Sequence, residues 1–194
     1  MASRTLQSWF RARVRFLLYC MLLGSGDVWG SQSDSSQGPG IEQRIGERIS
    51  LELPFRDELG NPVTLREAAD GKPSVLALVY YRCPMLCNQV ISGLLESLLE
   101  ISSSAGEQFN VITLSFDPTE GPDLASAKRE QYLKAYGHAS ARSGWRFLTG
   151  TPESISVVCR ETGFRTVYDP ATRLYGHASA LLILTPDGRI SRYL

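Results

Sequence analysis

An uninterrupted apolar run, Ser74–Tyr81, passes directly into a segment of helical periodicity, and this junction constrains the fold more than any other feature of the chain. A run of this length without a charged residue is typical of a central strand that is covered on both faces. From Pro84 to about Ser103 the apolar residues recur at the spacing of a helix with a broad apolar stripe. A buried strand followed by such a helix predicts an α/β fold.

Two cysteines, Cys83 and Cys87, lie at this junction. Pro84 suits the first position of a helix, where its missing N–H would have no partner, so we expect Cys83 at the helix cap and Cys87 one turn further in. The backbone N–H groups and the macrodipole at a helix entrance favour thiolate over thiol. Two such sulfurs can close a disulfide, or they can bind a soft metal such as Cu(I), zinc or an iron–sulfur cluster. An ordinary structural disulfide, or a pair of buried thiols, is the alternative.

The other elements follow from periodicity and turn signals. Ile41–Phe55 alternates as a strand and turns at Asp57–Pro62 into Val63–Leu65, which predicts an N-terminal β-hairpin. After the long helix we expect, in order, strand Phe109–Phe116, helix Asp123–Tyr136, strand Trp145–Leu148, a helix from Thr151 and Pro152, strand Phe164–Tyr168, and a hairpin of His177–Thr185 with Ile190–Leu194. This order predicts a thioredoxin-like α/β sandwich with an N-terminal β-hairpin, in which the usual C-terminal helix is missing.

Both histidines of the chain lie in the same pentapeptide, Tyr-Gly-His-Ala-Ser, as His138 and His177. A polar loop follows His138, which we therefore expect to be a solvated loop residue. His177 directly precedes the apolar run Ala178–Thr185, and a thioredoxin-like layout brings that run beside the strand that leads to Cys83. An imidazole there can complete a thiolate–thiolate–imidazole site, so Cys83, Cys87 and His177 are the predicted metal ligands. The alternative for His177 is a hydrogen-bonded residue at the start of a strand.

The charge and cysteine content limit the class of partner. The 194 residues include 20 basic and 20 acidic side chains, so the chain has no basic surplus with which to bind nucleic acid or anionic lipid. Four cysteines are too few for the disulfide scaffold of a small secreted module. Cys159 is expected in the core, since cysteine is among the most buried residue types. A protein partner or a small ion is the expected ligand.

The N-terminal residues have the organisation of a targeting segment. Residues 1–30 combine four arginines, the apolar stretch Phe16–Gly24 and a small residue at Gly30, which predicts a signal peptide or a membrane anchor that includes Cys20. Residues 31–44 are rich in Ser, Gln and Gly at their start and predict a flexible tether. Residues 45–194 are the predicted folded domain. We therefore expect an exported protein.

Together these motifs resemble the Sco/SenC family. The resemblance covers about residues 45–194 and is carried by Cys83-Pro84-Met85-Leu86-Cys87, Phe116-Asp117-Pro118, Trp145–Gly150 and the late His177. It implies a thioredoxin-like copper chaperone in which Cys83, Cys87 and His177 bind Cu(I) or Cu(II). It also implies delivery of copper to the binuclear centre of cytochrome c oxidase subunit II, with a copper donor protein and a thiol reductant as further partners. Members of the family normally continue into a further helix beyond the point that corresponds to Leu194.

The residues leave one rival function, a thiol–disulfide oxidoreductase acting on exported cysteine-containing proteins. Cys83 would be the attacking thiolate and Cys87 the resolving thiol. Three residues separate the cysteines, whereas the usual redox motif has two, and dithiol exchange needs no distal histidine. We therefore expect a metallochaperone rather than an enzyme.

Overall fold

The centre of the fold is a parallel pair of strands, β4 (Ser74–Val79) and β5 (Asn110–Ser115). The structure is a computed structural model that describes residues 38–84 and 86–194. A third strand, β6 (Trp145–Gly150), pairs in parallel with the other edge of β5. All residues of β4 except the half-buried Val75 are buried, as predicted for a strand that is covered on both faces, and β5 is buried along its whole length.

Antiparallel hairpins extend this parallel core at both edges. On one side β9 (Leu181–Leu184) pairs with β4, and β10 (Ile190–Tyr193) completes the predicted terminal hairpin. On the other side the predicted N-terminal hairpin of β2 (Pro54–Arg56) and β3 (Pro62–Thr64) pairs with β6. The result is a seven-stranded sheet with the order β10-β9-β4-β5-β6-β2-β3.

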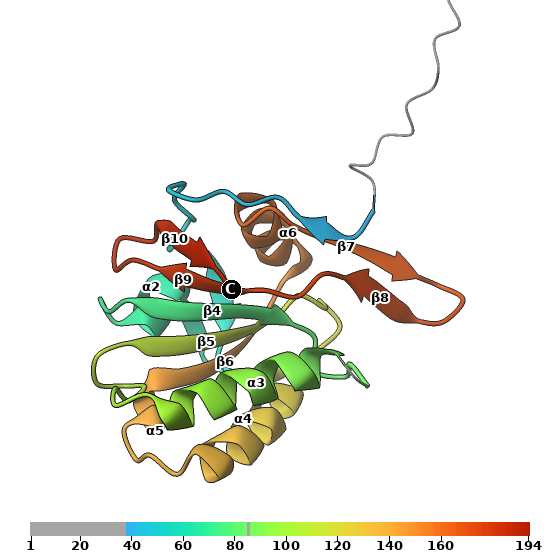
Figure 1. The fold of residues 1–194 in the computed structure, drawn as a ribbon. Coiled ribbons are helices and arrows are strands. Elements are labelled where there is room, and N and C mark those ends of the chain that lie inside the picture. Colours follow the sequence, from blue (N-terminus) through green and yellow to red (C-terminus); the bar gives the residue numbers. More distant parts are fainter. Residues whose placement is uncertain (1–37, 85) are drawn as a thin grey trace, which may run out of the picture. The chain divides into compact units, whose positions relative to one another are not determined.

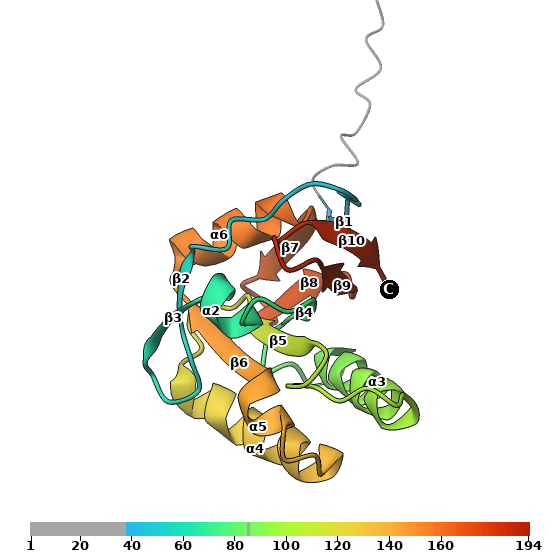
Figure 2. The ribbon, with the colours of Figure 1, turned by 90° about the vertical axis from the view of Figure 1, so that its left-hand side faces the viewer.

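Helices cover both faces of this sheet. Figures 1 and 2 show α3 (Leu86–Glu100) and α4 (Pro122–Tyr136) on one face, and α2 (Leu65–Ala69) and α6 (Pro152–Glu161) on the other. A short helix that the sequence did not predict, α5 (Ala141–Gly144), leads into β6. The arrangement is the predicted thioredoxin-like α/β sandwich.

A second, smaller sheet lies beside the sandwich. Its order is β1-β7-β8, from strands β1 (Gly40–Ile41), β7 (Phe164–Asp169) and β8 (Leu174–His177). The β7–β8 hairpin extends past the end of β4, on the side where α3 begins (Figure 1). The predicted single strand His177–Thr185 is therefore wrong, because β8 ends at His177 and β9 begins only at Leu181.

The predicted strand Ile41–Phe55 is also wrong over most of its length. Ile49 and Leu51 are buried, but the backbone around them is irregular and hydrogen-bonds to the β9–β10 turn, with the Ile49 N–H donating to the Gly188 carbonyl at 2.9 Å. The burial alternates here because the segment pairs with the β9–β10 turn and with Ile190 of β10 through an isolated β-bridge, Arg48 with Arg189, and not through a regular strand. Within the predicted tether, Gly40 and Ile41 pair with β7, so packed structure begins before residue 45.

The predicted signal or anchor, residues 1–30 with Cys20, lies outside the described residues. Over the described ranges, none of the helices combines the length and the apolar character that crossing a membrane requires.

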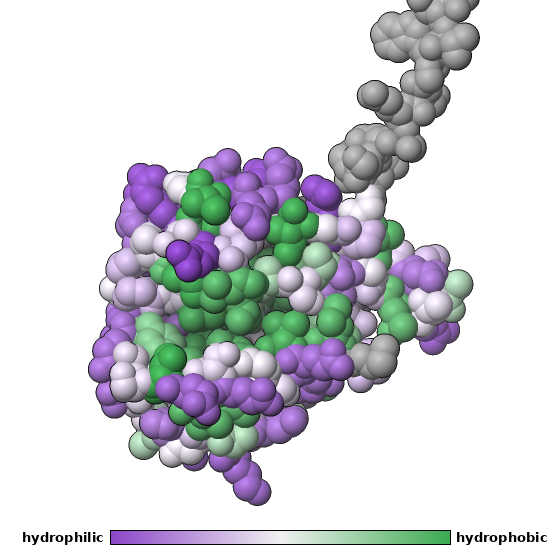
Figure 3. Space-filling view, in the orientation of Figure 1, coloured by the Kyte–Doolittle hydropathy of each residue, from purple (hydrophilic) through white to green (hydrophobic). Residues whose placement is uncertain are grey.

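A groove between α3 and β9 exposes apolar side chains, among them Val90, Leu181 and Leu194. Figure 3 shows this apolar area on the face of the molecule seen in Figure 1.

Candidate metal centre

The turn between β4 and α3 places the two cysteines of the motif. β4 ends at Val79 and α3 begins at Leu86, so Cys83 lies in the turn and Cys87 is the second residue of the helix. The helix begins later than predicted, and Pro84 precedes it instead of occupying its first position. Both cysteine side chains are buried, with exposed fractions of 6% for Cys83 and 2% for Cys87.

His177 reaches these cysteines from the second sheet. The sulfur atoms of Cys83 and Cys87 and a ring nitrogen of His177 all lie within 4.8 Å of one another. Cys87 Sγ and His177 Nε2 lie 3.5 Å apart, although the two residues are 90 positions apart in the chain. The structure therefore brings together all three predicted ligands, as a group of donors that can surround one metal ion.

A backbone carbonyl fixes the orientation of the imidazole. His177 Nδ1 lies 2.7 Å from the carbonyl oxygen of Ala178. Because a carbonyl oxygen can only accept, Nδ1 carries the hydrogen in this contact. The neutral ring then presents the lone pair of Nε2 toward the Cys87 sulfur, which is the state that a metal-binding histidine requires.

Aromatic rings form one wall of the site around His177. The centroid of the imidazole lies 5.3 Å from that of Phe116, 5.6 Å from that of Tyr80 and 6.4 Å from that of Phe164. Tyr175 packs against both Tyr80 and Phe116, with centroid distances of 5.5 Å in each case. Packed rings of this kind restrict the imidazole and keep water from one side of the sulfurs.

The two tyrosines that precede the cysteine motif, Tyr80 and Tyr81, have different roles. Tyr80 lies at the site, whereas the Tyr81 hydroxyl donates to the carbonyl oxygens of Thr113 and Leu148, at 3.0 and 2.8 Å, inside the core. Of the two, Tyr80 is thus the one that lines the site.

Burial governs the protonation of Cys87. Its sulfur accepts a hydrogen bond from the Tyr80 N–H at 3.4 Å, but burial, with a smaller contribution from Cys83, raises the pKa of the Cys87 thiol to about 12. The expectation that the helix entrance would favour a thiolate is therefore wrong for Cys87, because loss of solvent outweighs the local dipoles. A metal ion binding here must displace a proton from this thiol.

The sequence patterns did not predict one residue near the site, Glu120, whose carboxylate is buried. Its oxygens accept hydrogen bonds from the backbone N–H groups of Tyr81, at 2.6 Å, and Arg82, at 2.7 Å. Glu120 follows β5, the strand beside β4, and the carboxyl ends of neighbouring parallel strands meet at one edge of a sheet. That placement is the signal that could have revealed it.

Asp117 organises the turn before Glu120. Its carboxylate accepts from the Thr119 N–H at 2.9 Å and from the Thr119 hydroxyl at 2.8 Å, and lies 3.5 Å from the Tyr175 hydroxyl. Asp117 therefore links the turn that carries Glu120 to the aromatic wall.

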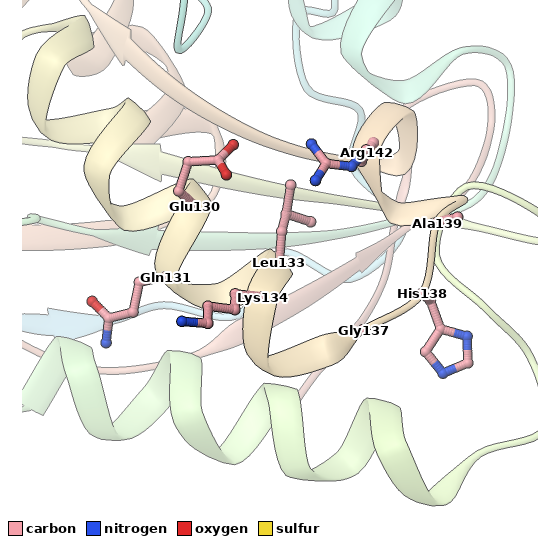
Figure 4. A pocket seen from close by; sticks show the side chains of 8 residues that line it. All are labelled: Glu130, Gln131, Leu133, Lys134, Gly137, His138, Ala139 and Arg142. Carbon is pink, nitrogen blue, oxygen red and sulfur yellow. The ribbon is translucent and has the colours of Figure 1, made fainter.

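The remaining candidate residues lie outside this centre. His138 is exposed in a loop, as predicted: its ring stacks on Tyr136 with centroids 4.4 Å apart, and Nδ1 lies 3.2 Å from the Ser104 hydroxyl. Figure 4 shows the groove at the end of α4 that His138 borders, with its ring pointing away from Glu130. Cys159, on α6, packs against the core as predicted.

Comparisons with known proteins agree with this geometry. The sequence profile of the SCO1/SenC family matches residues 42–194. A protein of Stutzerimonas stutzeri that is named for copper binding is 24% identical over 153 residues, which are 76% of this chain and 70% of that protein.

Two solved structures show the same fold. Arabidopsis thaliana ScoI with copper bound has a TM-score of 0.60 and 20% identity, over 78% of this chain and 87% of that one. BsSco, described as a member of the Sco family of cytochrome c oxidase assembly proteins and as containing a disulfide switch, has a TM-score of 0.53 and 18% identity, over 78% of this chain and 85% of that one. Because the family profile spans most of the residues, from the residue after β1 to the last hairpin, this chain belongs to the SCO1/SenC family.

Proposed function

We propose that the chain is a copper metallochaperone that binds one copper ion through Cys83, Cys87 and His177. The observation that carries the proposal is that the three donor atoms lie within 4.8 Å of one another. Thiolate sulfur selects soft metals, of which Cu(I) is the best match to a site with two sulfurs. The copper-binding name of the Stutzerimonas stutzeri relative and the copper in Arabidopsis thaliana ScoI support the same metal.

The number of donors favours transfer over permanent binding. Structural zinc sites are almost always closed by four protein ligands, whereas this group offers three. A three-donor site leaves a coordination position for a ligand of the receiving protein, so that copper can pass by ligand exchange. The sulfurs must be reduced for this, which requires a thiol reductant, and the copper must come from a donor protein.

The receiving protein that we propose is cytochrome c oxidase subunit II, with its binuclear copper centre. The family resemblance implies this partner, and the description of BsSco as belonging to cytochrome c oxidase assembly proteins supports it. We further propose that residues 1–30 direct or anchor the chain, that the segment after them tethers the domain, and that the domain acts in the periplasm or at the outer face of the cytoplasmic membrane.

Copper titration of the reduced protein tests the metal assignment. One Cu(I) per chain is expected in competition with a colorimetric chelator, and His177→Ala should weaken binding by at least tenfold. His138→Ala is the matched control, since the second histidine lies in the same pentapeptide but outside the centre. Absence of stoichiometric binding, or equal binding by both variants, contradicts the proposal.

A thiol–disulfide oxidoreductase is the second candidate. Two observations favour it: the sulfurs of Cys83 and Cys87 lie within 4.8 Å of each other, and the related BsSco contains a disulfide switch. The buried, protonated thiol of Cys87 is unfavourable for rapid exchange. If the protein is a reductase, it should reduce insulin, and His177→Ala should reduce insulin at the same rate. If it is a metallochaperone, neither protein should reduce insulin, and His177→Ala should lose copper binding.

A further inference from the structure

The turn that carries Cys83 is held by hydrogen bonds at four successive backbone N–H groups. The Tyr80 N–H donates to the sulfur of Cys87 at 3.4 Å, and the Cys83 N–H donates to the Tyr80 carbonyl at 3.2 Å. The two N–H groups between them, those of Tyr81 and Arg82, both donate to the carboxylate of Glu120. A single side chain, 38 residues further along the chain than Arg82, therefore fixes the middle of the turn.

The carboxylate of Glu120 is itself held tightly. Its Oε2 accepts from the Tyr81 N–H and from the Ser115 hydroxyl, both at 2.6 Å, and its Oε1 accepts from the Arg82 N–H at 2.7 Å. Hydrogen bonds this short are typical of an ionised acceptor. All three donors are neutral groups, so the buried charge is stabilised by hydrogen bonds from the backbone and from a hydroxyl.

The position of Glu120 couples two adjacent strands at the mouth of the site. Ser115 is the last residue of β5, and Tyr81 follows the end of β4, its parallel neighbour. The carboxylate thus joins the end of β5 to the turn in which Cys83 lies. The exposed fraction of Glu120 is 4%, so water cannot readily replace these contacts.

We propose that Glu120 is a positioning residue for the metal centre: its carboxylate clasps the Tyr81 and Arg82 amides and so sets the place of Cys83 relative to Cys87 and His177. The proposal rests on the metal-binding function proposed above and adds a residue that the ligand motif does not contain. Loss of the clasp frees two amides, and the turn can then move Cys83 away from the other two donors. Groups that orient metal ligands typically change metal affinity by about 10–100-fold when they are removed.

Glu120→Gln in the full chain is the first test, because the side chain keeps its shape but only one oxygen can accept. In the reduced, metal-free protein, amide hydrogen exchange should accelerate at Tyr81 and Arg82 and stay unchanged in the middle of β5. Cu(I) affinity should fall by about 10–100-fold. The sulfur-to-Cu(II) charge-transfer band should shift, which a general loss of stability would not cause.

Glu58→Gln is the control, since Glu58 is also a buried carboxylate but pairs with Arg129, at 3.0 Å, and Arg146, at 3.4 Å, near the N-terminal hairpin. It should lower the melting temperature and leave copper affinity within twofold. Glu120→Asp, which keeps the charge but is too short to span both amides, decides the question if Glu120→Gln does not fold. The proposal is overturned if the folded Glu120 variant has the copper affinity and the spectrum of the wild type. It is also overturned if Glu58→Gln loses as much copper affinity as the Glu120 variant.

The same experiments separate this inference from the proposed function. If the wild-type protein binds no copper, the metallochaperone proposal fails. The exchange rates of the Tyr81 and Arg82 amides then still report whether Glu120 holds the turn. If wild-type protein binds copper and the Glu120 variants bind it equally well, only the positioning role fails.

Discussion

The sulfur of Cys87 and Nε2 of His177 lie 3.5 Å apart although one belongs to a helix of the main sandwich and the other to the last residue of a strand in the smaller sheet. The packing of the β7–β8 hairpin against the aromatic wall therefore decides whether the three donors meet. Residues that hold this hairpin, and residues that hold the cysteine turn, should affect metal binding without being ligands themselves.

Phe116→Leu tests the aromatic wall. Phe116 contacts Tyr80, Phe164, Tyr175 and His177, so the smaller, non-planar side chain should loosen the imidazole. We expect a stability loss of about 1–3 kcal/mol in urea unfolding, as for a large-to-small substitution in the core, and a severalfold weaker Cu(I) affinity. A control in the core away from the site, Phe147→Leu, should cost similar stability and leave copper affinity unchanged. Equal affinities in all three proteins would contradict the role of the wall.

The metal-free protein should lose stability at alkaline pH. Burial raises the pKa of Cys87 to about 12 from an ordinary value of 9.0, so between these values the folded state binds more protons than the unfolded state. The contribution of this thiol is fully present below pH 9 and is lost as the pH rises toward 12. Each such thiol gives a slope of up to about 1.4 kcal/mol per pH unit in that window.

Urea unfolding of the reduced protein between pH 8.5 and about 10.5 measures this slope. Cys87→Ala should flatten it. Cys159→Ala should flatten it as well, because burial also raises the pKa of Cys159 to about 12, while leaving Cu(I) binding intact. A slope that is unchanged in both variants would show that neither thiol is protonated preferentially in the folded state.

Thr151→Ala separates stability from the site. The Thr151 hydroxyl accepts from the Ser154 N–H at 3.3 Å and caps α6, with Pro152 in the first turn. Removing such a cap costs about 0.5–2 kcal/mol. Thermal unfolding should report this loss, while copper affinity at a temperature where the variant is folded should equal that of the wild type. A drop in affinity of more than twofold would indicate that α6 positions the hairpin.

Sequence patterns predicted most of the sandwich because its strands and helices satisfy local rules. The charge-free run that became β4, the helical stripe that became α3, and the Thr151-Pro152 start of α6 each carry their own signal. The predicted strand over Ile41–Phe55 failed because burial alternates there for a different reason. Ile49 and Leu51 are buried beside the β9–β10 turn, where the backbone forms an isolated β-bridge between Arg48 and Arg189 instead of a regular strand.

The site was predictable as a set of donors but not as a structure. Cys83, Cys87 and His177 stood out because thiols and imidazole have few other uses at such positions, and they do lie together. Glu120 did not stand out, because a glutamate in a polar turn is ordinary until the strand order shows which backbone it faces. The pKa of Cys87 was misjudged because helix dipoles can be read from sequence whereas depth of burial cannot.

The separation of the three donors between the sandwich and the smaller sheet has a consequence for the proposed release of copper. Both sulfurs belong to the sandwich, one in the turn after β4 and one on α3, while the imidazole belongs to β8 at the edge of the three-stranded sheet beside it. Under the proposed function, a shift of this sheet away from α3 would withdraw the imidazole and leave two sulfur donors, so copper would leave the site in two steps. A recipient that contacts this sheet would then change the rate of release as well as the affinity.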